Sequence, residues 1–182
     1  MSPLRLLASL SLAICLMGCT TMKPTDFALS RQKLVLEEYF AGHTQAWGLF
    51  QDRFGKVRRQ FTVEIDGDWN GERLVLDEHF LYSDGETDRC LWTITKRADG
   101  HYEGTAADVV GTAQGMSAGN ALNWGYVMDL KVGTGTVRVR FDDWMFLQPG
   151  NVIINRATVS KWGIDVGDVT LFFLKPAGTA AS

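Results

Sequence analysis

Apolar and polar residues alternate with a period of two along most of the chain after Gly42. Alternation of this kind is typical of a β-strand with one buried face, because successive side chains point to opposite sides of a sheet. Turn sequences such as Asn70-Gly71 and Asp84-Gly85 separate the alternating runs. The pattern predicts roughly nine strands of about 6–12 residues. The cleanest run comprises Leu122, Trp124, Tyr126, Met128 and Leu130.

No amphipathic helices separate these runs, so the chain is predicted to be all-β. Strands at short, regular intervals favour a single antiparallel up-and-down barrel of about 8–10 strands, because closure removes exposed sheet edges. A β-sandwich is the alternative. The interior of such a barrel is either filled by side chains or holds one small ligand. Ahead of the strands, residues Arg31–Glu38 fit either a short helix or an extended segment.

The first residues have the pattern of a secretory signal. Arg5 precedes an apolar run over Leu6–Met17, which at about a dozen residues is too short to span a bilayer. The run ends in Leu16-Met17-Gly18-Cys19, which resembles a bacterial lipobox. That resemblance implies a lipid on Cys19, and Thr20 after it implies the periplasmic face of the outer membrane. An ordinary cleaved signal with an incidental cysteine is the alternative.

Three segments follow from these boundaries. Residues 1–18 are predicted to be a lipoprotein signal peptide, residues 19–28 a flexible tether, and residues 29–182 one β-barrel domain. The membrane, reached through lipidated Cys19, is therefore the first expected partner.

Composition narrows the classes of function. With 46% hydrophobic residues among 182, the chain can bury a sizeable core. The net charge of −3 is scattered and includes no basic stripe, so nucleic-acid binding is not expected. Cys90 stands alone in the body, and the three histidines are far apart in sequence. We therefore expect no metal and no cofactor. The protein is also expected to be a monomer.

Glu78 falls on the apolar side of its strand, between Leu76 and Phe80. An ionised carboxylate inside a barrel is unfavourable unless it is paired. Three interpretations stay open: a structural pair with an arginine, a polar anchor for a ligand's head group, or a bulge that turns Glu78 outward. An arginine facing the cavity would suit a fatty-acid carboxylate or a phosphate. Neighbouring strands offer Arg59, Arg89 and Arg156.

Asp142 and Asp143 are adjacent in a predicted strand, so a regular strand turns them to opposite faces. They are a poor pair for two-carboxylate catalysis, which needs both groups at one site. The parity that begins at Val137 places Asp143 inward, whereas a bulge near Asp142 would bury Trp144 instead. We favour the bulge, because a buried tryptophan is easier to explain than a buried aspartate.

One further motif has a catalytic reading. Residues Gly115–Gly119 match the Gly-x-Ser-x-Gly pattern of a hydrolase nucleophile elbow, with Ser117 at its centre. That motif needs a helix after the serine, but Asn120–Leu130 has the pattern of a strand. A glycine-rich connection between two strands is the better interpretation.

Short motifs are spread over the mature chain: Asp52-Arg53-Phe54-Gly55, Glu78-His79-Phe80, Asp84-Gly85, Gly119-Asn120-Ala121-Leu122-Asn123-Trp124, Asp142-Asp143-Trp144-Met145, Ile154-Asn155-Arg156-Ala157 and Lys161-Trp162-Gly163. Together they resemble an uncharacterised family of Gram-negative lipoproteins, known only as a domain of unknown function. The resemblance implies a lipocalin-like barrel and no catalytic residues. Members often occur near genes for modification of membrane fatty acids, which implies lipid handling by association.

The leading hypothesis is that the barrel binds or carries a fatty acyl chain, a phospholipid or another lipid. One alternative is a structural or envelope-assembly lipoprotein with a filled barrel. The other is an enzyme acting on a lipid-like substrate through Glu78 or Asp143; we expect binding rather than catalysis. The candidate ligand-binding residues are Glu78, Arg59, Arg89, Trp92, Trp124, Tyr126, Asp143 and Arg156.

Overall fold

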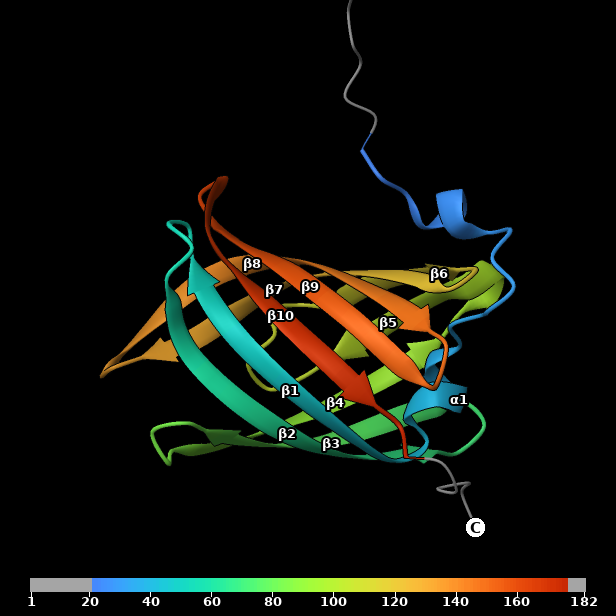
Figure 1. Cartoon of the computed structure of the whole chain (residues 1–182), viewed down its shortest axis with the longest axis horizontal. Helices are drawn as coiled ribbons and strands as arrows, with labels where there is room; N and C mark the ends of the chain where they lie inside the picture. The colour runs from blue at the N-terminus through green and yellow to red at the C-terminus, as the bar shows by residue number, and fades with distance from the viewer. Residues whose placement is uncertain (1–20, 177–182) are drawn as a thin grey trace, which may run out of the picture.

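Ten antiparallel strands form one closed up-and-down barrel in the computed structural model, which describes residues 21–176 (Figure 1). The predicted signal peptide and the lipidation site at Cys19 lie outside the described residues. Each strand pairs with the next along the chain, and β10 pairs with β1 to close the barrel. The strands are β1 Gly42–Asp52, β2 Val57–Trp69, β3 Arg73–Tyr82, β4 Thr87–Lys96, β5 His101–Thr105, β6 Ala113–Ala118, β7 Ala121–Val132, β8 Gly135–Gln148, β9 Val152–Lys161 and β10 Ile164–Leu174.

Closure decides between the two architectures that the alternation allows. The register between β1 and β10 runs without interruption from Gln45 opposite Leu174 to Asp52 opposite Gly167. The sheet therefore has no open edge at this seam, which confirms the barrel and excludes the sandwich. The alternating residues face as predicted, because Leu122, Trp124 and Met128 of β7 are all buried.

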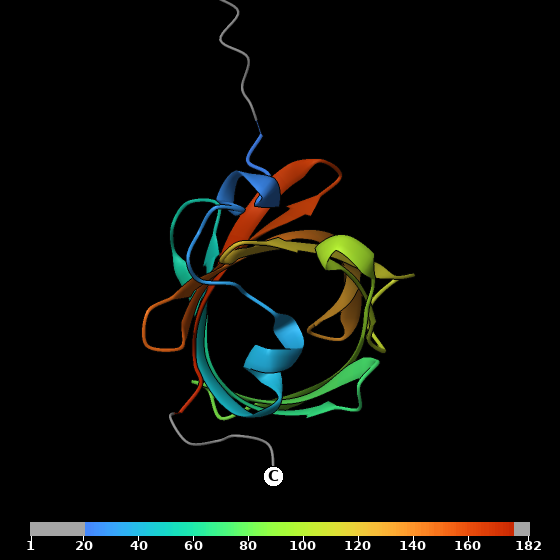
Figure 2. The same cartoon turned by 90° about the vertical axis from the view of Figure 1, so that its right-hand side faces the viewer.

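Helix α1 (Leu36–Phe40) closes one end of the barrel, which we call the closed end (Figure 2). The segment before it is extended, so the helix begins later than the predicted Arg31–Glu38. Its buried Glu37 accepts hydrogen bonds from Lys96 of β4 and from the Tyr102 hydroxyl of β5, the latter at 2.9 Å. Burial raises the pKa of Glu37, but these hydrogen bonds outweigh it and hold that pKa below its usual range. The charged pair thus fixes the helix to the wall.

Two short 3₁₀ helices complete the described chain, η1 (Pro24–Phe27) and η2 (Ala98–Gly100). Phe27 of η1 lies on the outside of the barrel, where its ring is 5.3 Å from that of Phe146 and 6.4 Å from that of Trp144. Residues at the end of the predicted tether are therefore in contact with the barrel wall.

Two glycines, Gly67 and Gly115, leave room for side chains and backbone to pack closely near the closed end. A Cβ atom at Gly67 would lie 1.8 Å from the carbonyl oxygen of Phe40, so only glycine lets α1 approach β2 this closely. A Cβ atom at Gly115 would lie 2.0 Å from the Trp124 ring. The Trp124 indole therefore occupies the space in front of β6.

Candidate functional site

The barrel interior holds a cavity of about 940 Å³. It extends from Leu36 and Phe40 of α1 to Lys131 and Val132 at the hairpin tips, which we call the open end. Its size falls within the range of small-molecule sites, which measure roughly 300–1,000 Å³. The wall is largely apolar and aromatic, with side chains from nearly every strand. The filled-barrel alternative therefore does not describe this protein.

Four polar side chains line the cavity from β3, β7, β8 and β9, and we call them the polar floor: Glu78, Tyr126, Asp143 and Asn155. Asp143 and Asn155 lie on adjacent strands β8 and β9 and are both buried. The Asn155 amide nitrogen donates hydrogen bonds to Asp143 Oδ1 and, at 3.2 Å, to the carbonyl oxygen of Trp144. Glu78 reaches the floor from β3, where it faces Cys90 of β4.

Burial makes the floor carboxyls poor acids. It raises the pKa of Glu78 to about 8, and the negative charge of Asp143 adds to this rise. Burial also raises the pKa of Asp143 to about 7, against the hydrogen bond from Asn155, which favours the charged form. Because the two groups repel each other when ionised, the floor is neutral in mildly acidic solution and gains negative charge above neutral pH.

Several acceptors of this region have no partner. Among the described residues, no group donates a hydrogen bond to the Glu78 carboxyl, although Glu78 lines the cavity. Asn155 Oδ1 is buried without a partner, and so is Oδ1 of Asp108, from the segment between β5 and β6. Buried polar atoms are normally satisfied by protein, water or ligand. The floor is therefore suited to a molecule that donates hydrogen bonds.

The candidate arginines do not meet this floor. Arg59 lies at the open end, where its guanidinium stands 3.5 Å from the Tyr82 ring centroid and pairs with Asp84 and Glu86. Arg89 points outward and binds Asp77 through two hydrogen bonds of 2.7 Å. The expectation of an interior arginine at Arg89 or Arg156 is wrong, because parity turns both to the outer wall. Arg156 pairs there with Asp168 at 3.1 Å.

The predicted bulge in β8 is also wrong. Pairing of β8 with β7 and with β9 runs without a register shift, so Asp143 faces inward as strict alternation requires. Trp144 lies outside, stacked on Phe146 with ring centroids 5.9 Å apart. For Glu78, regular pairing excludes the outward bulge, and the positions of the arginines exclude an interior Glu–Arg pair. Two of the three interpretations of Glu78 are therefore excluded.

Comparison with known protein families places this chain in a family. The sequence profile of a family described as a protein of unknown function (DUF3833) matches residues 13–175. The chain belongs to the DUF3833 family. No curated protein matches the chain. The match agrees with the resemblance to an uncharacterised family, and its description names no activity.

Aromatic rings line the cavity of this DUF3833 barrel beside the floor. The Trp92 ring lies 6.0 Å from Trp124 and 5.4 Å from Tyr126, both in edge-on contacts. Tyr126 stacks on Phe141 with centroids 4.8 Å apart. The structure thus brings together five of the sequence-predicted candidates, while Arg59 lies at the open end and Arg89 and Arg156 lie on the outer wall. The five are Glu78, Trp92, Trp124, Tyr126 and Asp143.

The other catalytic motif does not form a site. Ser117 lies within strand β6, not on a strand-to-helix turn, and its hydroxyl donates to the carbonyl oxygen of Leu34. Within residues 21–176, no group of histidine, cysteine and acidic side chains has the arrangement of a metal site. None of the helices in these residues has the length and hydrophobicity needed to cross a bilayer.

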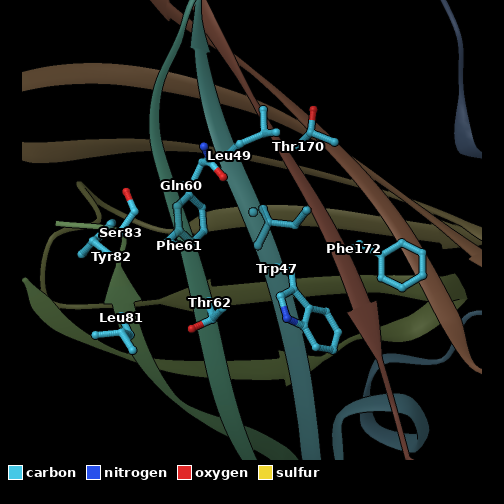
Figure 3. A pocket seen from close by; sticks show the side chains of 12 residues that line it. Trp47, Leu49, Gln60, Phe61, Thr62, Leu81, Tyr82, Ser83, Thr170 and Phe172 are labelled. Atoms are coloured by element: carbon cyan, nitrogen blue, oxygen red, sulfur yellow. The ribbon is translucent and has the colours of Figure 1, made fainter. Parts of the chain in front are cut away.

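A second hollow, of about 550 Å³, lies on the outer wall over β1, β2 and β10 (Figure 3). Trp47 and Phe172 border it, with ring centroids 6.4 Å apart. No charged side chain lines it. It therefore lacks the polar chemistry of the interior cavity, which is the better candidate site.

Proposed function

We propose that this protein binds an amphipathic, lipid-like molecule inside the barrel. The polar end of the ligand would lie against Glu78, Asp143 and Asn155, and its apolar part would run along the aromatic wall toward the open end. The observation that carries this proposal is a cavity of about 940 Å³ with a largely apolar wall and unpartnered acceptors among its lining side chains. Apolar walls with a few convergent polar groups are typical of small-molecule sites.

The chemistry of the floor narrows the ligand class. A fatty-acid carboxylate would need a cation or hydrogen-bond donors, and the floor instead presents carboxyls and the oxygen of Asn155. A hydroxyl or an amine at the polar end can donate to these acceptors. We therefore propose a lipid-like ligand with a donor head group, such as a long-chain alcohol or an acylglycerol, in place of a fatty-acid anion.

An enzymatic role has less support. Carboxyls with a pKa near neutrality in an open cavity are suited to acid–base chemistry. Arg58, Arg59, Arg89 and Lys131 contribute to the cavity lining, but among the described residues none of them pairs with Glu78 or Asp143 to stabilise developing charge. Burial raises the pKa of Cys90 far above its usual range, so its thiol is a poor nucleophile. Ligand binding explains the polar floor without requiring a cation beside the carboxyls or a reactive thiol.

The location of the protein is a second part of this proposal. The lipobox-like Leu16-Met17-Gly18-Cys19 supports a lipid on Cys19 and anchoring at the periplasmic face of the outer membrane. A lipid anchor would hold the cavity close to a source of amphipathic molecules. Intact mass spectrometry of the membrane-extracted protein would detect the lipid on Cys19, and its absence would remove this part of the proposal.

Dodecanol binding tests the proposal for the interior. All ten strands lie within residues 21–176, so a chain that begins at Thr21 contains the whole barrel. Isothermal titration should show saturable binding at one site. Replacing Val137 and Val169, which line the cavity, by tryptophan should weaken binding at least about ten-fold, or about 1.4 kcal/mol, because the added rings occupy the cavity.

The matched control replaces the outward neighbours Thr136 and Thr170 by tryptophan, which should leave the affinity unchanged. Circular dichroism checks that both double variants fold. No dodecanol binding by the wild-type barrel, or equal loss in both double variants, would contradict the proposal.

A further inference from the structure

We propose that the open end of the barrel docks on bilayers that contain anionic phospholipid. The surface concerned, which we call the rim, consists of three hairpin tips: residues 53–57, 131–132 and 161–164. The strands behind these tips are neighbours in the barrel, in the order β7, β8, β9, β10, β1 and β2. The backbone nitrogen of Arg53 also donates to the carbonyl oxygen of Val166 at 3.0 Å, which joins the β1–β2 tip to strand β10. In Figure 1 the β1–β2 and β9–β10 hairpins project from the same end, opposite α1.

Large apolar side chains point into solvent at every tip of the rim. Trp162 is 90% exposed, Phe54 79%, Val132 58% and Ile164 57%. Single exposed apolar residues are ordinary, but several on adjacent loops around a cavity mouth mark an interaction surface. Aromatic rings with polar neighbours are also the side chains that settle at the interface of a bilayer with water.

Cations accompany these apolar residues in a repeated order. Four of the five exposed apolar residues directly follow a basic one, in Arg53-Phe54, Lys56-Val57, Lys131-Val132 and Lys161-Trp162; the fifth, Ile164, follows Gly163. Among the described residues, none of these four cations has an acidic partner. Three acids lie close to these tips in sequence: Asp165 has no basic partner among the described residues, whereas Asp52 and Asp129 are bound by Arg58 and Arg138. The rim is therefore positive although the whole chain carries −3.

Trp162 occupies a strained position. It forms the two-residue turn between β9 and β10 with Gly163, and both have positive φ, 53° and 77°. Turns of this kind favour Asn-Gly, because bulky residues rarely adopt positive φ. Residues held in such conformations cluster at functional sites. The exposed Trp162 ring does not pack against the barrel; its one ring contact among the described residues is with the Lys161 amine, 4.5 Å from the ring centroid. Binding to something outside the molecule therefore explains a tryptophan in this turn better than packing does.

The neighbouring β3–β4 tip shows that this pattern is not general. It reads Ser83-Asp84-Gly85-Glu86, with two acids and no large apolar residue. Arg59 of β2 binds both acids, and the tip itself contains no basic residue. Apolar and basic residues thus occur together on the same tips, as adsorption to an anionic bilayer requires. A second copy of the chain is a poorer occupant, because a rim-to-rim dimer would bring like charges together.

Vesicle co-sedimentation tests this inference, with the chain that begins at Thr21. We expect binding to phosphatidylcholine vesicles that contain phosphatidylglycerol, much weaker binding without it, and loss of binding at high salt. Trp162→Asn should lower the partition coefficient at least about ten-fold while raising Tm, because asparagine suits the turn. Lys131→Gln and Lys161→Gln should each lower it about five-fold.

Two controls lie at the closed end, where Leu29 is 99% exposed and Arg31 is also exposed. Leu29→Asn and Arg31→Gln should leave vesicle binding unchanged. Equal binding by Trp162→Asn, equal binding to neutral vesicles, or a Trp162-dependent dimer in sedimentation velocity would overturn the inference. Because none of these measurements involves dodecanol, their outcome is independent of ligand binding in the cavity.

Discussion

Raising the pH from 5 to 8 is expected to lower the free energy of unfolding of the barrel by on the order of 4 kcal/mol. The source of this loss is the polar floor. Burial raises the pKa of Glu78 to about 8 and that of Asp143 to about 7, whereas both carboxyls have a pKa near 4 in an unfolded chain. The unfolded chain therefore releases protons that the folded barrel keeps. Each group lowers stability by up to about 1.4 kcal/mol per pH unit in this window.

Other titrating groups do not reverse this direction. The pKa of Glu37 is lowered on folding, so its contribution to stability is present above its unfolded pKa and is lost only as the solution becomes strongly acidic. The hydrogen bond from His43 to Asp66 raises the pKa of His43. Its contribution is present in acid and is lost as the pH rises through its folded pKa, which adds to the same trend. The floor must therefore be isolated by mutation.

Urea unfolding at several pH values makes this measurement. Glu78→Gln and Asp143→Asn should each flatten the fall in stability between pH 5 and 8, and each variant should exceed the wild type in stability at pH 8. Glu72→Gln is the matched control, because Glu72 is exposed in the turn between β2 and β3 and lies outside the cavity. An unchanged slope in both floor variants would show that these carboxyls are not protonated inside the barrel.

The charge on the polar end of a ligand should control how its affinity depends on pH. Dodecanoate is an anion above about pH 6, so the growing negative charge of Glu78 and Asp143 should lower its affinity by up to about ten-fold per pH unit between pH 6 and 8. Dodecylamine, a cation, should show the opposite trend. Dodecanol, which is neutral, should change least.

Glu78→Gln separates this effect from a general change in the protein. With one titrating group removed, the pH dependence for dodecanoate should weaken, while Glu72→Gln should leave it as in the wild type. Isothermal titration gives all three affinities. Dodecanoate affinity that stays constant or rises with pH would contradict a floor made of carboxyls.

Alternation along the sequence predicted the fold and much of the wall, for a simple physical reason. Side chains in a regular strand face opposite sides of a sheet, so the parity of Leu76 and Phe80 placed Glu78 inside the barrel. The same rule turned Trp92, Trp124 and Tyr126 inward. These positions depend only on local periodicity, which the sequence displays directly.

The wrong predictions concern side chains whose direction depends on the three-dimensional packing of the barrel. We favoured a buried Trp144 over a buried Asp143, because a carboxyl in a filled core would be unfavourable. The cavity removes that objection, and a sequence does not reveal empty space. Parity alone would have placed Arg89 and Arg156 outside, since their neighbours Cys90 and Asn155 face inward. Asp108 was missed because the segment between β5 and β6 has no alternation from which to predict its direction.

Crystals of the barrel with dodecanol that carries a terminal bromine provide the most direct test of the central claim. Anomalous scattering locates the bromine, and the electron density locates the hydroxyl. We predict the hydroxyl within hydrogen-bond distance of Glu78 or Asn155 Oδ1, and the bromine toward the open end near Val137. Bromine at the polar floor, or a ligand seated only in the outer hollow beside Trp47 and Phe172, would contradict it.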